Sequence, residues 1–426
     1  MTAAETIVAL SSGRPPAAIA VVRLSGPHAV AAASALAISL PPHRHAGLRD
    51  LVDPATGDTL DTALILHFPA PASVTGEDVV ELHCHGGRAV VEAVLRVLLA
   101  EPGVRLADPG EFTRRALASG RIDLTEAEGL ADLLAAETEL QRRVAQARAG
   151  GGLRDLLAGW RLRLLDLSAA AEVAIDYPDE EDGVIAPSLA DDLDSLADEV
   201  RALLASPRVE PLREGVRVVF AGPPNTGKSS LLNVLSKSER AIVTPIPGTT
   251  RDSIEVPLAI DGLPLLLVDT AGLRDSADTV EQLGIARAEQ EVVRADVLLW
   301  LGPPDAAPIH PRLLLVHAKA DLAPASDARQ LAVSALTGDG LDRLTREIGA
   351  VAAALIPSPR QLSLTGREAG LLMTLLSALE AARAQTTSLH AAEELRYARE
   401  AIDRITGLSS VDAVLDALFA RFCLGK

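Results

Sequence analysis

The stretch Gly222-Pro-Pro-Asn-Thr-Gly-Lys-Ser229 matches the pattern G-x-x-x-x-G-K-[ST]. It follows the strand-like run 216–221 and precedes an apolar-periodic segment that predicts a helix from about Ser230. In this setting, successive backbone N–H groups surround phosphates at the start of the helix. The feature therefore predicts a phosphate-binding loop, in which Lys228 reaches the β- and γ-phosphates and the Ser229 hydroxyl binds Mg²⁺.

Two downstream motifs favour GTP over ATP. Gly248-Thr-Thr-Arg-Asp252 supplies a threonine, Thr250, that can bind Mg²⁺. Asp269-Thr-Ala-Gly272 follows the apolar run 265–268 and has the D-x-x-G form, in which the aspartate holds the metal through water and the glycine N–H meets the γ-phosphate. Between the two motifs, residues 260–263 predict a hairpin turn.

The base-reading motif departs from the usual pattern. GTPases related to translation factors carry Asn-Lys-x-Asp after a buried strand, whereas here the run 313–316 leads into Ala318-Lys-Ala-Asp321. Asp321 can still accept hydrogen bonds from the guanine ring N–H and amine, and Lys319 can lie over the purine. The missing amide is expected to cost on the order of 1 kcal/mol in nucleotide affinity, so guanine preference survives in weakened form. Ser334-Ala-Leu336 fits the last base-contacting loop.

The residue after the D-x-x-G motif is Leu273, which cannot orient an attacking water. Glu281, in the acidic segment 275–281, is the candidate for that role; the alternative is a solvated glutamate at the start of a helix. Charge that develops on the transferred phosphoryl group also needs a cation. Asn225 can help to hold a monovalent ion, and Arg251 is a further candidate catalytic residue.

Composition limits the classes of protein to consider. The chain has 426 residues and a net charge of −18, which argues against a protein that coats nucleic acid electrostatically but leaves room for a local RNA-binding patch. No apolar stretch approaches the roughly 20 residues that span a bilayer, and no signal peptide is expected. With two cysteines, Cys84 and Cys423, we expect a reducing cytoplasmic compartment and no disulfide framework. The lack of a long apolar stretch predicts no membrane contact.

The pattern of apolar residues divides the chain into regions. Residues 1–118 predict a mixed α/β region, with strands at 19–24, 63–68 and 78–83 and helices at 29–36 and up to about 99. Helical periodicity then dominates 125–149, 153–174 and 187–205, and it returns in 365–385, 391–406 and 410–422. Because three C-terminal helices alone would bury little, we expect the helices on both sides of the nucleotide-binding core to pack together, with the core as an insertion.

The run His83-Cys84-His85 invites a zinc interpretation, which we reject. Along a strand His83 and His85 share one face while Cys84 points to the other, and no second cluster supplies further ligands.

Dispersed motifs resemble the MnmE (TrmE) family of tRNA modification GTPases over essentially the full length. Besides the GTPase motifs, they lie at residues 22–27, 75–87, 109–113 and 175–181 and in the C-terminal Cys-x-Gly-Lys. The resemblance implies a multidomain α/β plus all-α fold. It predicts a tetrahydrofolate-binding and dimerisation domain (1–118), a discontinuous helical domain (119–210 and 356–426) and an inserted Ras-like GTPase domain (214–354).

The resemblance also implies an activity and partners. Family members act as homodimers with the flavoprotein MnmG, in a heterotetramer, to install an aminomethyl-type group, usually carboxymethylaminomethyl, on carbon 5 of the wobble uridine of tRNA. The one-carbon unit comes from a tetrahydrofolate derivative, in the 5,10-methylene or 5-formyl form. By position, the folate contacts are Arg23, Glu81, Arg121 and Lys426. An acid there suits the pterin amines and cations suit carboxylates, although Arg121 stands where lysine is common.

K⁺-stimulated GTP hydrolysis is a further implication of the resemblance. The K⁺ ligands implied are Asn225, Thr244, Ile246 and Thr249, with Ser229 and Thr250 on Mg²⁺ and Glu281 near the attacking water. Pro245 and Pro247 depart from the family pattern in the K⁺ loop, but proline keeps its carbonyl. The full set of candidate GTP-binding residues is Asn225, Thr226, Gly227, Lys228, Ser229, Ser230, Thr244, Thr249, Thr250, Asp269, Thr270, Ala271, Gly272, Lys319, Asp321, Ser334, Ala335 and Leu336.

Three alternatives stay open at this point. Cys423 is either a nucleophile toward the uridine, with Lys426 and Arg421 favouring its thiolate, or a side chain packed beneath the folate. The chain as a whole could instead be a ribosome-assembly GTPase of the Era or Der type, although it has one P-loop and no KH-type clamp. It could also be a folate-dependent transferase with a degraded GTPase switch, against which the intact metal-binding residues argue.

Overall fold

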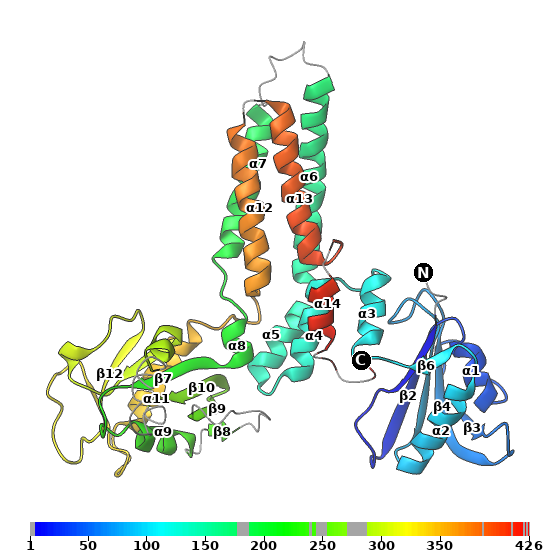
Figure 1. Ribbon diagram of the computed structural model, residues 1–426, viewed down its shortest axis with the longest axis horizontal. Coiled ribbons are helices and arrows are strands. Elements are labelled where there is room, and N and C mark those ends of the chain that lie inside the picture. The colour runs from blue at the N-terminus through cyan, green and yellow to red at the C-terminus, as the bar shows by residue number, and fades with distance from the viewer. Residues whose placement is uncertain are drawn as a thin grey trace, which may run out of the picture. The chain divides into compact units, whose positions relative to one another are not determined.

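The computed structural model describes residues 5–176, 187–237, 241–243, 254–270, 288–385, 387–409 and 412–420, together with Phe422 and Gly425. The chain forms two compact units: residues 1–131 with 403–426, and residues 132–402 (Figure 1). In the described part of the chain, no helix is long and apolar enough to cross a bilayer.

The first unit is built on a six-stranded sheet of order β3-β4-β5-β2-β1-β6. Its strand pairs are antiparallel except for the parallel pair of β1 and β6. The strands are β1 (Thr6–Leu10), β2 (Ile19–Ser25), β3 (Gly47–Val52), β4 (Thr59–Phe68), β5 (Val79–His85) and β6 (Val104–Leu106). The strands predicted near residues 19, 63 and 78 are confirmed.

One face of this sheet is buried and the other is partly open. Leu24, Ile65 and Leu82 form a core with α1 (Ala29–Leu36) and α2 (Arg88–Ala100). Because side chains alternate along a strand, residues one position away point to the opposite face. That face carries partly exposed side chains, among them Arg23 and Glu81.

A small helical cluster completes the first unit. Helices α3 (Glu111–Ala118), α4 (Leu124–Ala135) and α14 (Asp412–Phe419) bury a common apolar core that includes Leu124, Phe419 and Phe422. Gly110 precedes α3 with a φ of 72°, and a Cβ there would lie 2.9 Å from the Phe419 carbonyl oxygen. Glycine is therefore required where the chain enters α3.

The second unit contains a helical bundle and the GTPase core. Its long helices are α5 (Glu139–Ala149), α6 (Gly152–Asp176), α7 (Pro187–Leu204), α12 (Gly366–Ala384) and most of α13 (Ser388–Thr406). Helices α7 and α12 pack side by side, although the whole GTPase core lies between them in sequence (Figure 1). The expected packing of helices from both sides of the core is confirmed.

The single helix predicted over 125–149 is wrong in one respect. The chain forms two helices, because α4 ends at Ala135 and α5 begins at Glu139. Thr138 caps α5: its side chain accepts from the Gln141 N–H, and the Gln141 side chain accepts from the Thr138 N–H. This capping box stabilises a new helix start at a point where apolar periodicity alone continues unbroken.

The GTPase core is a seven-stranded sheet of order β13-β12-β11-β7-β10-β9-β8. The pairs among β13, β12, β11, β7 and β10 are parallel, whereas β9 and β8 are antiparallel additions, so the predicted mostly parallel sheet is confirmed. The elements are α8 (Glu210–Glu214), β7 (Val216–Ala221), α9 (Lys228–Ser236), β8 (Ala241–Val243), β9 (Ile254–Ile260), β10 (Leu263–Asp269), β11 (Val297–Trp300), η2 (Pro304–Ala306), β12 (Leu313–His317), β13 (Leu331–Ala332) and α11 (Leu341–Ala353).

The predicted hairpin turn joins β9 to β10. Asp261 and Gly262 occupy its two central positions with φ angles of 51° and 81°. Two successive positive φ angles define the turn that matches the twist of a tight antiparallel hairpin. The turn fixes the register in which Ile254 lies opposite Asp269.

Candidate functional site

The phosphate-binding loop connects the end of β7 to the start of α9. Gly222 has a φ of 144°, and a Cβ at this position would lie 2.8 Å from the Leu301 carbonyl oxygen. Asn225 and Gly227 also have positive φ angles, of 61° and 97°. These conformations curl the loop in front of the N-terminus of α9, the arrangement that binds phosphates.

The lysine of this loop is buried, and its charge faces the loop itself. Lys228 is 4% exposed, and its Nζ donates to the carbonyl oxygens of Gly222 at 3.0 Å and Pro223 at 2.7 Å. Thr226 Oγ1 also donates to the Pro223 carbonyl, at 2.9 Å. An ammonium group enclosed by the loop is placed to meet phosphate oxygens that enter there.

Ser229 and Asp269 come together although 40 residues separate them in the sequence. The Ser229 Oγ donates a very short hydrogen bond to Asp269 Oδ2, and Asp269 is only 1% exposed. Thr270 is held at the same strand end, since its Oγ1 donates to the Phe220 carbonyl at 2.8 Å. Hydroxyl and carboxylate oxygens are the ligands that Mg²⁺ prefers, so these residues fit that ion.

The base-reading residues lie on two neighbouring loops. Lys319 Nζ donates to the carbonyl oxygen of Asn225 at 2.8 Å, which ties this loop to the phosphate-binding loop. Ser334 is fully buried and its Oγ donates to Asp321 Oδ1 at 2.6 Å. Leu336 follows on the surface and is 85% exposed. The carboxylate of Asp321 is therefore oriented by Ser334, as a guanine-reading group needs to be.

Ala318 stands where related GTPases have asparagine. Its side chain is 8% exposed, and a Cβ added at Gly227 would lie 3.4 Å from the Ala318 Cβ. The missing amide would therefore have been next to the phosphate-binding loop. Ser230, also predicted to contact nucleotide, lies on the exposed surface of α9 next to Ser229.

Ten predicted site residues lie outside the residues that the structure describes. They are Thr244, Ile246, Thr249, Thr250, Arg251, Ala271, Gly272, Glu281, Cys423 and Lys426.

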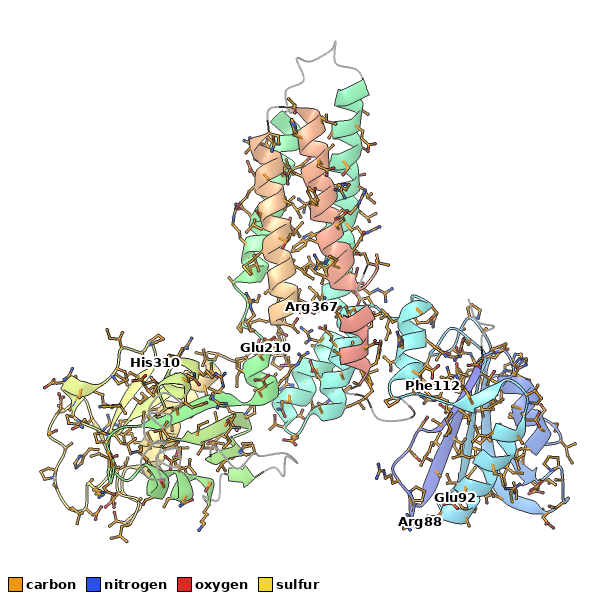
Figure 2. All side chains as sticks on the ribbon, in the orientation of Figure 1. Arg88, Glu92, Phe112, Glu210, His310 and Arg367 are labelled. Atoms are coloured by element: carbon orange, nitrogen blue, oxygen red, sulfur yellow. The ribbon has the colours of Figure 1, made fainter. Side chains whose placement is uncertain are left out.

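A second cluster of predicted residues lies on the open sheet face of the first unit. Arg23 on β2 and Glu81 on β5 are directly opposite in register. The Arg23 Nε donates to Glu81 Oε1 at 2.9 Å, and the Arg23 guanidinium lies 5.6 Å from the ring centroid of Phe112 (labelled in Figure 2). The other carboxylate oxygen of Glu81 lies 3.2 Å from His83 Nε2.

Arg121 is exposed just beyond the end of α3. Its Cγ would lie 3.6 Å from a Cβ at Gly76, so it borders the loop that precedes β5. Sequence reasoning missed His83 and Phe112 as neighbours of the Arg23–Glu81 pair. The alternation of strand residues could have found His83, which is two positions from Glu81 and shares its face.

The His-Cys-His run has the predicted alternation. Cys84 is buried among apolar side chains, and burial raises the pKa of its thiol to about 12. His85 is on the opposite face, where its Nδ1 lies 2.7 Å from Asp61 Oδ1. Among the described residues, no group of three or more His, Cys, Asp or Glu side chains could hold a metal ion.

Known protein families and full-length relatives match this chain over nearly its whole length. Residues 6–121 match the family profile of the GTP-binding protein TrmE N-terminus, and residues 124–423 match that of the MnmE helical domain. The tRNA modification GTPase MnmE of Erythrobacter litoralis (strain HTCC2594) is 52% identical over 424 residues, which cover 99% of this chain and 100% of that protein. The chain belongs to the MnmE family of tRNA modification GTPases. The MnmE of Novosphingobium aromaticivorans (strain ATCC 700278 / DSM 12444 / CCUG 56034 / CIP 105152 / NBRC 16084 / F199) is 48% identical over 435 residues, with 99% and 100% coverage.

Membership of the MnmE family confirms the resemblance drawn from the motifs. It also confirms the enzyme class, a GTPase that takes part in tRNA modification, and the multidomain α/β plus helical fold. The full-length match sets aside the ribosome-assembly GTPase that the GTPase core alone left possible.

Proposed function

We propose that this chain hydrolyses GTP in a K⁺-stimulated manner and, with the flavoprotein MnmG, uses a tetrahydrofolate one-carbon unit to modify wobble uridine in tRNA. The product is 5-carboxymethylaminomethyl or aminomethyl uridine. The proposed domains are 1–118 for folate and dimerisation, 119–210 with 356–426 for the helical domain, and 214–354 for GTP. The observation that carries the folate part is the Arg23–Glu81 pair on an open sheet face.

The GTPase part of the proposal rests on the contact between Ser229 and Asp269. A Mg²⁺ ion bound there supplies positive charge that neutralises charge developing on the phosphates. Lys228 adds a second cation from within the loop, and Asp321, oriented by Ser334, accepts hydrogen bonds from guanine. Asn225 supports the proposed K⁺ site, because it lies in the phosphate-binding loop with a left-handed backbone and is exposed, so its side-chain oxygen is accessible to an ion.

The proposed K⁺ ligands are Asn225, Thr244, Ile246 and Thr249, and Thr250 is the proposed second Mg²⁺ ligand. Glu281 is proposed to orient the attacking water, with Arg251 as a further catalytic group.

The folate part is supported by the chemistry of the open face. The Glu81 carboxylate can accept hydrogen bonds from the pterin ring N–H and amine, while the hydrogen bond from Arg23 holds it in place. Arg121 and Lys426 supply the proposed cationic contacts to glutamyl carboxylates. Gly425 supports the contribution of the C-terminus, since a Cβ on it would lie 2.3 Å from the Leu10 carbonyl oxygen at the end of β1.

A homodimer is supported by the same face. Ile19 on β2 is 58% exposed and Leu48 on β3 is 64% exposed, and by strand alternation both lie on the same sheet face as the Arg23–Glu81 pair. Exposed apolar side chains on one face of a sheet favour association with a second copy of that face. We propose that the tRNA modification takes place in the cytoplasm, since the two cysteines suit a reducing compartment.

Folate binding tests the proposal directly. We expect the purified protein to bind 5-formyltetrahydrofolate in a calorimetric titration, and Glu81→Gln to weaken binding roughly 10- to 150-fold, as for the loss of a charged hydrogen bond. Asp50→Asn is the matched control, because Asp50 on the edge strand β3 pairs only with Thr62 of β4 in its described contacts on the same sheet. No binding by the wild type, or equal binding by Glu81→Gln, would refute the folate assignment.

A further inference from the structure

Arg217 is the one charged residue of strand β7, and its side chain is only 20% exposed. Because side chains alternate along a strand, Arg217 shares a sheet face with Val219 and Ala221, which belong to a buried apolar cluster. A charged group in such surroundings is unfavourable unless it is paired and hydrogen-bonded. The identity of its partners therefore indicates what the residue does.

The Arg217 guanidinium joins two carboxylates from different elements. Its Nη2 donates to Glu255 Oε1 and to Glu291 Oε2, both at 2.6 Å, and its Nε donates to the same Glu291 oxygen at 2.9 Å. Glu255 is in β9, and Glu291 is in the helical residues 288–294. A single side chain thus connects β9 to that helix across the sheet.

Both connected elements border segments that carry proposed catalytic residues. Strand β9 directly follows residues 244–253, which contain Thr250, and residues 288–294 directly follow residues 271–287, which contain Glu281. Ile254, the neighbour of Glu255, pairs with Asp269 across β9 and β10. Arg217 therefore holds the chain where each of these segments rejoins the GTPase core.

Within the described residues 288–295, the apolar contacts with the sheet are made by few side chains. Val292 and Ala295 pack in the apolar cluster on the sheet face, and Ala288 is also buried. Such short side chains bury little apolar surface. The planar guanidinium, in contrast, donates in fixed directions, so two carboxylates bound to it are held at a defined separation.

We propose that Arg217 is a positioning residue for GTP hydrolysis, which sets the separation between β9 and the helical residues 288–294. This inference rests on the proposed roles of Thr250 and Glu281. Arg217 touches neither nucleotide-binding loop in its described hydrogen bonds, so it acts on the chemical step and not on nucleotide affinity. A displacement of catalytic groups by about 1 Å can lower a rate by about 10²-fold.

The test compares single-turnover GTP hydrolysis in KCl with GDP affinity for the full-length protein. In Arg217→Gln we expect the rate constant to fall about 10- to 100-fold while the GDP dissociation constant stays unchanged. Arg217→Lys should give an intermediate rate, since lysine keeps the charge but lacks the planar guanidinium that can bind two carboxylates in fixed directions. Arg312→Gln is the matched control, because Arg312 Nη1 donates a single 3.3 Å bond to the Asp296 carbonyl near the same strand and should leave the rate unchanged.

A triple variant separates positioning from stability. Arg217→Met with Glu255→Gln and Glu291→Gln removes all three charges, which restores stability without restoring the fixed separation. We expect its melting temperature to recover and its hydrolysis rate to stay low. Recovery of the rate together with stability, or a parallel loss of GDP affinity in Arg217→Gln, would overturn the inference. K⁺-independent or absent GTP turnover by the wild-type protein would overturn the proposed function, on which this inference rests. If the wild type turns over GTP and the rate of Arg217→Gln is unchanged, only this inference is overturned.

Discussion

Replacing Glu368 by glutamine should strongly destabilise the second unit. Glu368 is fully buried at the start of α12, and Arg148, whose side chain is 5% exposed, donates to its two carboxylate oxygens at 3.0 and 3.3 Å. Glu368 also closes a capping box, since Oε2 accepts from the Thr365 N–H at 2.7 Å. The substitution keeps the shape of the side chain but leaves the Arg148 charge without its main partner.

The expected loss of folding stability in Glu368→Gln follows from these contacts. Removing one partner of a buried ion pair destabilises a protein by about 3–5 kcal/mol, because the other charge stays buried. Two features place this case at the lower end, near about 3 kcal/mol. Glutamine can still accept the Thr365 N–H bond, and Asp132 lies 3.8 Å from Arg148 and compensates part of its charge.

The same pair predicts a pH dependence. Burial alone would raise the pKa of Glu368, but the charge and hydrogen bonds of Arg148, together with the Thr365 N–H, outweigh it and lower the pKa below its ordinary value. A carboxyl group with a lowered pKa in the folded state contributes stability above its unfolded-state pKa of about 4.3. That contribution is lost as the pH falls from there through the folded-state pKa, and Glu368→Gln should lack this part of the acid sensitivity.

The assay is chemical unfolding followed by the fluorescence of Trp160, which is buried on α6, in a Trp300→Phe background. Glu380→Gln is the control, because Glu380 lies on the same helix as Glu368 but makes an exposed pair with Arg201 of α7, so its loss should change the stability little. Equal, small losses for the two substitutions would refute the reasoning about the buried pair.

Three further outcomes are expected at the nucleotide site and in the first unit. Ala318→Asn should tighten GDP binding by about 1 kcal/mol, roughly fivefold, in a fluorescence titration; unchanged affinity would show that position 318 does not reach the base. Lys228→Ala should weaken GTP binding roughly 10- to 150-fold through loss of a charged hydrogen-bond donor, and equal affinity would contradict the assigned loop. In a Cys423→Ser protein, Cys84 should resist a thiol reagent at about pH 8 until the protein is unfolded, because its pKa is about 12 and it is buried. Rapid labelling of the native protein would contradict that burial.

Local sequence signals predicted the GTPase core well. The phosphate-binding loop, the β9–β10 turn and the strand before Asp321 are each specified by residues close together in sequence, so their structure follows from local chemistry. The capping box at Thr138 was an equally local signal that went unused. Strands β1, β3 and β6 were missed because they are short and lie in or near edge positions, where alternation is weak.

Contacts between distant residues could not be predicted from single motifs. The Arg23–Glu81 pair depends on the register of β2 with β5, and the Arg217 contacts depend on where residues 288–294 pack against the sheet. The packing of Phe112 beneath Arg23 depends on the placement of α3. Each of these is a tertiary arrangement that periodicity alone does not specify.

We propose above all that this chain is a GTPase that needs K⁺ and is selective for GTP. The most direct measurement is hydrolysis by the purified protein in KCl and in NaCl at equal ionic strength, with ATP as the control nucleotide and Glu281→Ala alongside. We expect turnover of GTP that requires K⁺ and falls in the Glu281→Ala variant. Equal and negligible rates in both salts would contradict it and would favour a folate-dependent transferase with a degraded GTPase switch.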